Sequence, residues 1–168
     1  MEPSSMDAFL AYWARIHGRT RRLLDPILDD RLEWTWRQGA WTVGDLIRHL
    51  AALERYMFAE NAAGRPSRYR SCGEELASGK AAVIDLFERL NAETVAILAS
   101  LGDARLQERC VTPGGAELSV AKWLRAMVEH HAHHRGQLYL YLSMLGVETP
   151  PLYGLTAEAV ADRGVDPS

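Results

Sequence analysis

The sequence predicts an all-α protein, a bundle of four helices. Four stretches carry apolar residues at the spacing of an amphipathic helix, whereas few stretches show the alternation of a half-buried strand. The chain has 168 residues, which fits a single domain over 1–168. A domain of this length can bury roughly 70% of the surface of its unfolded chain, so it needs no disulfide to be stable.

The first helix is expected over about residues 5–25. Phe9, Trp13 and Ile16 follow one another at spacings of four and three residues, which places them on one face of a helix. Pro26 ends or kinks this helix, because proline disfavours the helical conformation in the residue before it.

The second helix is expected over about residues 42–62. Thr42 can cap its first turn, and Asp45, three residues later, resembles the acid of a capping box. One apolar stripe then follows along the helix: Val43, Leu46, Leu50, Leu53 and Met57.

The third and fourth helices are expected over about 74–101 and 119–145. Each has one apolar stripe, and Gly102 and Gly146 are well placed to end them. A turn is predicted at 112–115, where the sequence is Thr-Pro-Gly-Gly. The tail, 147–168, is expected to be irregular, with at most a short helix at 156–161. Four amphipathic helices with one apolar stripe each favour a four-helix bundle.

The composition excludes several classes of protein. The formal net charge is −3, so a broad basic surface for nucleic acid is not expected. No apolar run approaches the ~20 residues of a membrane span, and the N-terminus lacks the features of a signal peptide. Cys72 and Cys110 form no CxxC motif, which favours a reducing environment. We therefore expect a cytoplasmic protein with neither membrane nor nucleic-acid partners.

Four of the six histidines lie in residues 129–137, Glu-His-His-Ala-His-His-Arg-Gly-Gln. Successive helical side chains are about 100° apart, which places His130 and His134 on or beside the apolar stripe of the fourth helix. His131 also points inward, and His133 points to the side. Residues four positions apart are neighbours on one helical face. His130 and His134 can therefore bind one divalent cation, by the same geometry as in an HExxH zinc site, although the glutamate of that motif is missing.

A metal site needs at least a third protein ligand. His49 lies at the margin of the apolar stripe of the second helix and is the best candidate for that ligand. His17, between Ile16 and Gly18, is expected to lie on the surface. The alternative is that the histidines are partly exposed and have no ligand. A haem held by two histidines is disfavoured, because His130 and His134 are too close together to sandwich a porphyrin.

Three segments resemble motifs of the DinB-like (DinB/YfiT) superfamily. Residues 41–50, WTVGDLIRHL, resemble its helix-2 motif, W-[ST]-x3-[LI]-x2-H-L. Residues 130–138, HHAHHRGQL, are similar to its helix-4 motif, H-x2-H-H-R-G-Q, and residues 145–154 are similar to the segment that follows. The resemblance covers roughly residues 9–161.

This resemblance implies an up-down-down-up four-helix bundle that is usually a homodimer. It also implies a divalent metal held by three histidines, which correspond to His49, His130 and His134 in this chain. The family contains thiol-dependent transferases and isomerases, and its name refers to induction by DNA damage, a stress response, rather than to DNA binding.

Three neutral imidazoles leave open positions on a bound cation. Such a cation can acidify water or ionise a thiol. The first hypothesis is therefore a metal-dependent enzyme, a small-thiol S-transferase or a hydrolase, acting on a small molecule with a low-molecular-weight thiol as co-substrate. The alternative is a non-catalytic, stress-associated bundle with a structural metal. Zinc, nickel and iron all accept imidazole ligands, so the metal stays open.

The sequence identifies no catalytic acid or base. Ligand imidazoles usually donate their second nitrogen to a nearby acceptor, and Glu129, Arg135 and Gln137 are candidates to lie beside them. Trp34, Trp36 and Trp41 could form the wall of a pocket or close one end of the bundle.

Overall fold

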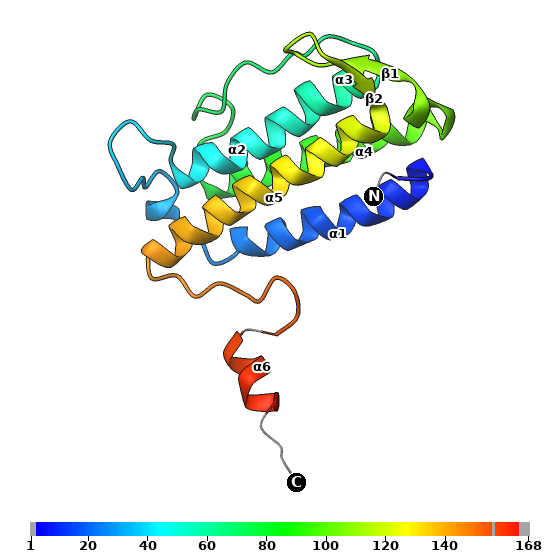
Figure 1. Cartoon of the computed structure of the whole chain (residues 1–168). Coiled ribbons are helices and arrows are strands. Elements are labelled where there is room, and N and C mark those ends of the chain that lie inside the picture. Colours follow the sequence, from blue (N-terminus) through cyan, green and yellow to red (C-terminus); the bar gives the residue numbers. More distant parts are fainter. Residues whose placement is uncertain (1–2, 156, 165–168) are drawn as a thin grey trace.

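Four long helices form the body of the protein (Figure 1). The computed structural model describes residues 3–155 and 157–164. The long helices are α1 (Met6–Leu24), α2 (Val43–Leu53), α4 (Lys80–Leu101) and α5 (Val120–Met144). The π-helical segment η2 (Glu54–Ala59) and the short α3 (Glu60–Ala62) continue α2 along the bundle. The predicted all-α four-helix bundle is confirmed.

Short elements occupy the connections and the tail: η1 (Asp29–Arg31), η3 (Ala104–Gln107), β1 (Arg109–Val111), β2 (Glu117–Ser119) and α6 (Ala157–Gly164). The two strands form an antiparallel hairpin around the turn predicted at 112–115, with Cys110 opposite Leu118. The sequence did not predict this hairpin, because strands of three residues are too short to show a clear alternation. The tail helix lies close to the expected one, although residue 156 is outside the described residues.

The third long helix begins at Lys80, six residues after the expected start at 74. Gly79, directly before it, has a φ of 81°, a conformation that glycine adopts more easily than other residues. Leu76 packs against the core from the loop before the helix. Its apolar side chain extended the predicted stripe beyond the true start of the helix.

The long connection at 63–79 decides the topology. It runs back along the bundle, so α2 and α4 point in the same direction, and α1 and α5 point the opposite way (Figure 1). Lys80 Nζ donates to the carbonyl of Asp25 at 2.8 Å, which joins the start of α4 to the end of α1. At the other end, the backbone N–H of Met6 donates to Asp103 Oδ1 at 2.7 Å. The helices are therefore arranged up-down-down-up, as the family resemblance implied.

The interior consists of two apolar clusters with buried polar residues between them. One cluster contains Trp13 and Met127, and the other contains Leu50 and Leu138. We call six of the buried polar residues the polar layer: His17, Thr20, Glu54, Thr94, His131 and His134. The ring centroid of His131 lies 5.0 Å from that of Trp13 in the first cluster and 6.4 Å from that of Phe87 in the second. All four long helices, or their direct extensions, contribute to it.

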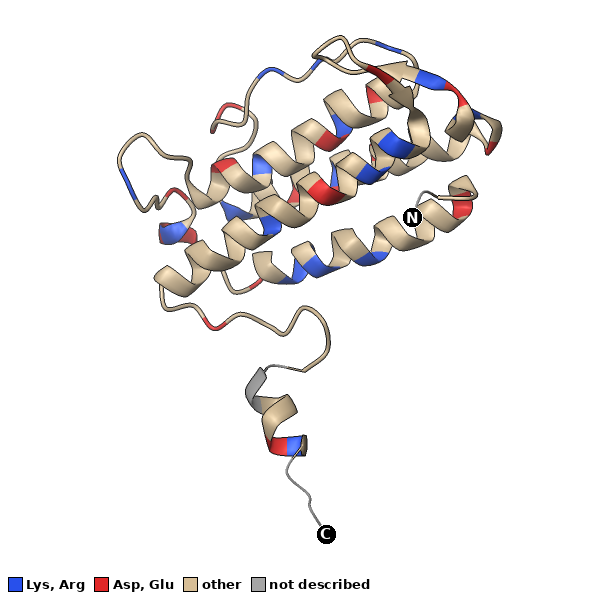
Figure 2. Ribbon diagram, viewed as in Figure 1, with Lys and Arg blue, Asp and Glu red and all other residues tan. Residues whose placement is uncertain are grey.

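Acidic and basic residues are interspersed over the helices and loops (Figure 2), in keeping with the small net charge. Among the described residues, none of the helices combines the length and apolar character that crossing a bilayer requires.

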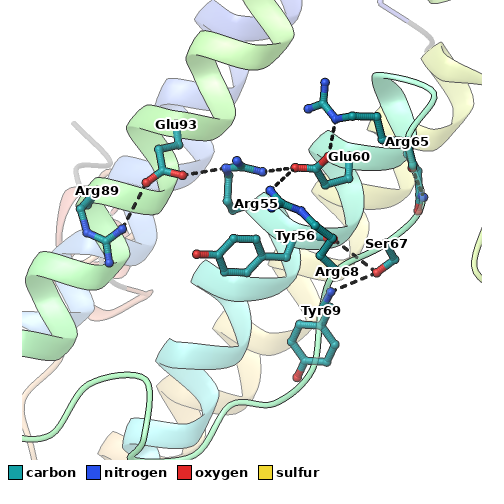
Figure 3. Close-up of polar contacts among 10 residues, drawn as sticks. Arg55, Tyr56, Glu60, Arg65, Ser67, Arg68, Tyr69, Arg89 and Glu93 are labelled. Carbon is teal, nitrogen blue, oxygen red and sulfur yellow. Dashed lines mark hydrogen bonds and ion pairs between the residues drawn. The ribbon is translucent and has the colours of Figure 1, made fainter.

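Glu60 fastens the start of the long connection to the helices (Figure 3). Its side chain is only 2% exposed and pairs with Arg55, with Arg65 at 2.5 Å and with Arg68 at 2.7 Å. Arg55 also pairs with Glu93 of α4 at 2.8 Å. Burial alone would raise the pKa of Glu60, but the hydrogen bonds from the three arginines outweigh burial and lower that pKa to about 2.

We expect Glu60→Gln to lower the free energy of unfolding by about 1–3 kcal/mol, because three arginines lose the buried charged acceptor that they share. The carboxylate of Glu60 stabilises the fold fully above its ordinary pKa of 4.5, and this contribution is lost as the pH falls toward 2. Urea unfolding between pH 7 and 3 measures both effects. Glu129→Gln, at an exposed pair with Arg125, is the control and should change stability by less than about 0.5 kcal/mol. Equal effects of the two substitutions would contradict the assignment.

Candidate metal centre

Three histidine rings from two helices meet at one point. His49 comes from α2, and His130 and His134 lie one turn apart on α5. One ring nitrogen of each lies within 4.8 Å of those of the other two. The Nε2 atoms of His49 and His130 are 3.1 Å apart. The ring centroid of His134 lies 4.6 Å from that of His49 and 4.4 Å from that of His130. This approach is close enough for all three imidazoles to reach a single cation.

The start of α2 is held firmly, and this fixes the position of His49. Thr42 and Asp45 form the predicted capping box, with both hydrogen bonds present. Arg48, next to His49 in sequence, is fully buried and binds Glu33, Asp45 and the carbonyl of Ala77. These bonds tie the first turns of α2 to the loops on either side, so the helix has little freedom to rotate away from α5.

Gly44 makes room for this arrangement. A Cβ at this position would lie 2.7 Å from Glu33 Oε1 and 2.8 Å from Arg48 Nη2. Any larger residue would therefore displace the ion pair that anchors the helix before His49.

Two of the three imidazoles have a hydrogen-bond partner on the nitrogen that faces away from the other rings. Tyr69 Oη lies 2.8 Å from His49 Nδ1. Gln137 Oε1 lies 2.7 Å from His134 Nδ1 and, as a carbonyl oxygen, accepts its proton. His134 Nδ1 therefore carries the hydrogen, which leaves the lone pair on Nε2. Within the described part of the chain, His130 Nδ1 is buried without a hydrogen-bond partner.

The sequence had named Gln137 as a neighbour of the ligands but had missed Tyr69. Tyr69 lies in the connection at 63–79, where no helical spacing relates it to His49. Of the other two candidates, Glu129 is exposed and pairs with Arg125 at 3.2 Å. Arg135 is buried but donates to Tyr153 Oη at 2.8 Å.

Trp41 is the tryptophan that lies at the histidines. Its ring is 4.6 Å from that of His49 and 5.8 Å from that of His134, and the residue is 40% exposed. Trp34 instead packs edge-on against Tyr141, and Trp36 is exposed. Of the three residues considered for a pocket wall, Trp41 alone is in contact with the histidines by these ring distances.

The environment of the site favours neutral imidazoles. Burial, together with the nearby ring of His134, lowers the pKa of His49 to about 4 and that of His130 to about 3. Burial also lowers the pKa of His134 itself. Because the neutral imidazole is the form that binds metal, the free protein has its rings in the binding form at neutral pH.

The remaining histidines have different surroundings. His131 is fully buried on another side of α5, and His133 is exposed. His17 corrects a prediction, because it is buried at 6% exposure and its ring stacks on Phe87 at 4.3 Å. It lies on the buried face of α1 together with Thr20. The prediction was wrong because a sequence pattern identifies a buried face by its apolar residues, and these two inward positions are polar.

The DinB superfamily model matches residues 12–138, which is most of the chain. The chain belongs to the DinB superfamily. It is also 24% identical over 165 residues to the uncharacterized protein YrdA of Bacillus subtilis, with 96% of each chain covered.

Solved structures share the DinB fold. A DinB-like protein of Bacillus cereus superposes with a TM-score of 0.75 at 21% identity, over 89% of this chain and 99% of that one. YfiT of B. subtilis, described as a probable metal-dependent hydrolase, superposes with a TM-score of 0.67 at 17% identity. The match covers 85% of this chain and 89% of YfiT. A mycothiol-dependent maleylpyruvate isomerase superposes with a TM-score of 0.62 at 19% sequence identity, and the match covers 79% of this chain and 60% of that one.

We expect His49 and His130 of the metal-free protein to stay neutral as the pH falls from 7 to 5.5, because burial disfavours the charged ring. In the folded protein both pKa values lie below the ordinary 6.5. The two neutral rings therefore stabilise the fold fully above pH 6.5, and this contribution is lost as the pH falls toward 4. NMR spectra of the imidazole nitrogens measure each titration. A midpoint near 6.5 for either ring would contradict the geometry of the site.

Proposed function

We propose that His49, His130 and His134 together bind one divalent metal ion and that the protein uses this ion in catalysis. The observation that supports the proposal most directly is the approach of three ring nitrogens from two helices to within 4.8 Å of one another. A structural zinc site is usually closed by four protein ligands, whereas three ligands leave a position for water or substrate. The donor set is thus that of a catalytic site and suits zinc, nickel or iron.

The residues around the histidine triad, by which we mean His49, His130 and His134, support the same assignment. Tyr69 and Gln137 orient two of the imidazoles through their outer nitrogens, as second partners of metal ligands commonly do. The Trp41 ring lies beside the rings of His49 and His134 and covers them on one side. A bound divalent ion would supply positive charge that lowers the pKa of a coordinated water or thiol.

We favour an S-transfer reaction, in which the sulfur of a low-molecular-weight thiol forms a bond to an electrophilic carbon of a small substrate. The thiol proton goes to the departing group in a substitution or to the substrate in an addition. The structural similarity to a mycothiol-dependent isomerase supports thiol chemistry on this fold. Hydrolysis is the second candidate, because YfiT, which shares the fold, is described as a probable metal-dependent hydrolase.

We expect His130→Ala to lose stoichiometric metal, because two imidazoles are too few to hold a divalent ion tightly. His133→Ala is the matched control, since His133 lies on the same helix but is exposed, and it should retain the metal. Elemental analysis of protein purified without an affinity tag measures the metal content. Full metal content in His130→Ala would show that the ion binds elsewhere.

The activity is tested with protein reconstituted with zinc, nickel or iron. The metal-loaded protein should consume a low-molecular-weight thiol and an electrophilic substrate, whereas the metal-free protein and His130→Ala should not. His133→Ala should remain active. A metal that raises the melting temperature but supports neither thiol transfer nor ester hydrolysis in the screen would instead indicate a purely structural ion.

A further inference from the structure

The interior of the bundle contains a second polar site, separate from the histidine triad. It consists of His17 and Thr20 of α1, Glu54 at the start of η2, and His131 of α5. These four residues belong to the polar layer and are all nine-tenths or more buried. None of them is a proposed metal ligand, so the site is not explained by the proposed function.

Both ring nitrogens of His131 have partners. Its Nδ1 is hydrogen-bonded to Glu54 Oε1, and its Nε2 lies 2.5 Å from Thr20 Oγ1. A neutral imidazole has one donor and one acceptor nitrogen. Two arrangements satisfy both contacts. Either Nδ1 donates to the carboxylate of Glu54 and the hydroxyl of Thr20 donates to Nε2, or the protonated carboxyl of Glu54, whose pKa burial raises to about 8, donates to Nδ1 and Nε2 donates to Thr20.

Two atoms of the site remain unsatisfied. Glu54 Oε2 and His17 Nε2 are buried without a hydrogen-bond partner in the described part of the chain. His17 lies beside the pair, because its ring centroid is 6.4 Å from that of His131, which is itself hydrogen-bonded to Glu54. Burial is the main cause that lowers the pKa of His17 to about 4, and a negative charge on Glu54 opposes this shift. Buried polar atoms in native proteins nearly always bind either protein or ordered water.

We propose that one ordered water molecule occupies the interior of the bundle and bridges Glu54 Oε2 and His17 Nε2. Water fits because it can donate to one group and accept from the other, and buried waters typically bind otherwise unsatisfied polar groups of this kind. A metal ion fits less well, because both nitrogens of His131 are already used and a carboxyl oxygen and one imidazole are too few ligands.

The bridging water completes a hydrogen-bonded chain from Thr20 through His131 and Glu54 to His17. This chain links α1, η2 and α5 across the centre of the bundle. The π-helical turn begins at Glu54, and such turns in an α-helix often occur at functional positions. Because His131 is adjacent to His130, the chain also fixes the part of α5 that carries the histidine triad.

A crystal structure that resolves ordered water tests the proposal directly. We expect one peak within about 2.7–3.2 Å of both Glu54 Oε2 and His17 Nε2. Direct contact between the two side chains, or a gap without density, would overturn the proposal.

A double-mutant cycle tests the coupling in solution. Glu54→Met and His17→Phe each remove a hydrogen-bond partner of the water while keeping the length or the ring shape of the side chain approximately. Each should lower the urea midpoint of unfolding, and the double variant should lower it by clearly less than the sum. The control pairs His17→Phe with Glu60→Gln, since Glu60 is bound by arginines, and its two shifts should add. Additive shifts for Glu54→Met with His17→Phe, measured at the same metal content, would show that no water joins these groups.

Discussion

The structure depends on the requirement that buried polar side chains find partners. The polar layer interrupts the apolar core, and a buried polar side chain that finds no hydrogen-bond partner destabilises the fold by the free energy of its desolvation. Apolar contacts are non-directional and do not by themselves fix how one helix is positioned along another. A hydrogen bond does, because it is lost when its donor and acceptor move apart by about 1 Å. The bond between Glu54 and His131 therefore sets how η2 and α5 align, and that alignment places His130 and His134 opposite His49.

The histidine triad is rigid because its two helices are held from outside the site. The capping box at Thr42 and the bonds of Arg48 fix the start of α2, and the polar layer fixes the middle of α5. The side chains that approach the metal position therefore need little rearrangement to bind an ion. This pre-organisation explains how two imidazoles can lie with their Nε2 atoms 3.1 Å apart in an otherwise well-packed bundle.

Helical spacing was sufficient to predict the four helices and to bring His49, His130 and His134 together. Each of these histidines lies on or beside an apolar stripe, so its direction could be read from its neighbours. Tyr69, the short hairpin and the start of α4 at Lys80 could not be predicted, because they depend on a loop without periodicity. His17 was assigned to the surface because sequence patterns identify a buried face by its apolar residues, and the polar layer breaks that rule.

The connection at 63–79 has a consequence for how this fold can diversify. A tight hairpin would make neighbouring helices antiparallel, whereas this segment crosses the length of the bundle and carries Tyr69 past His49. This segment forms no helix, so insertions that leave Leu76 and Ala77 packed against the core change its length without shifting a helical register. Related proteins can therefore carry different side chains in this connection, at the position of Tyr69, while the three histidines stay the same. Substrate preference can change in this way without a change in the helices.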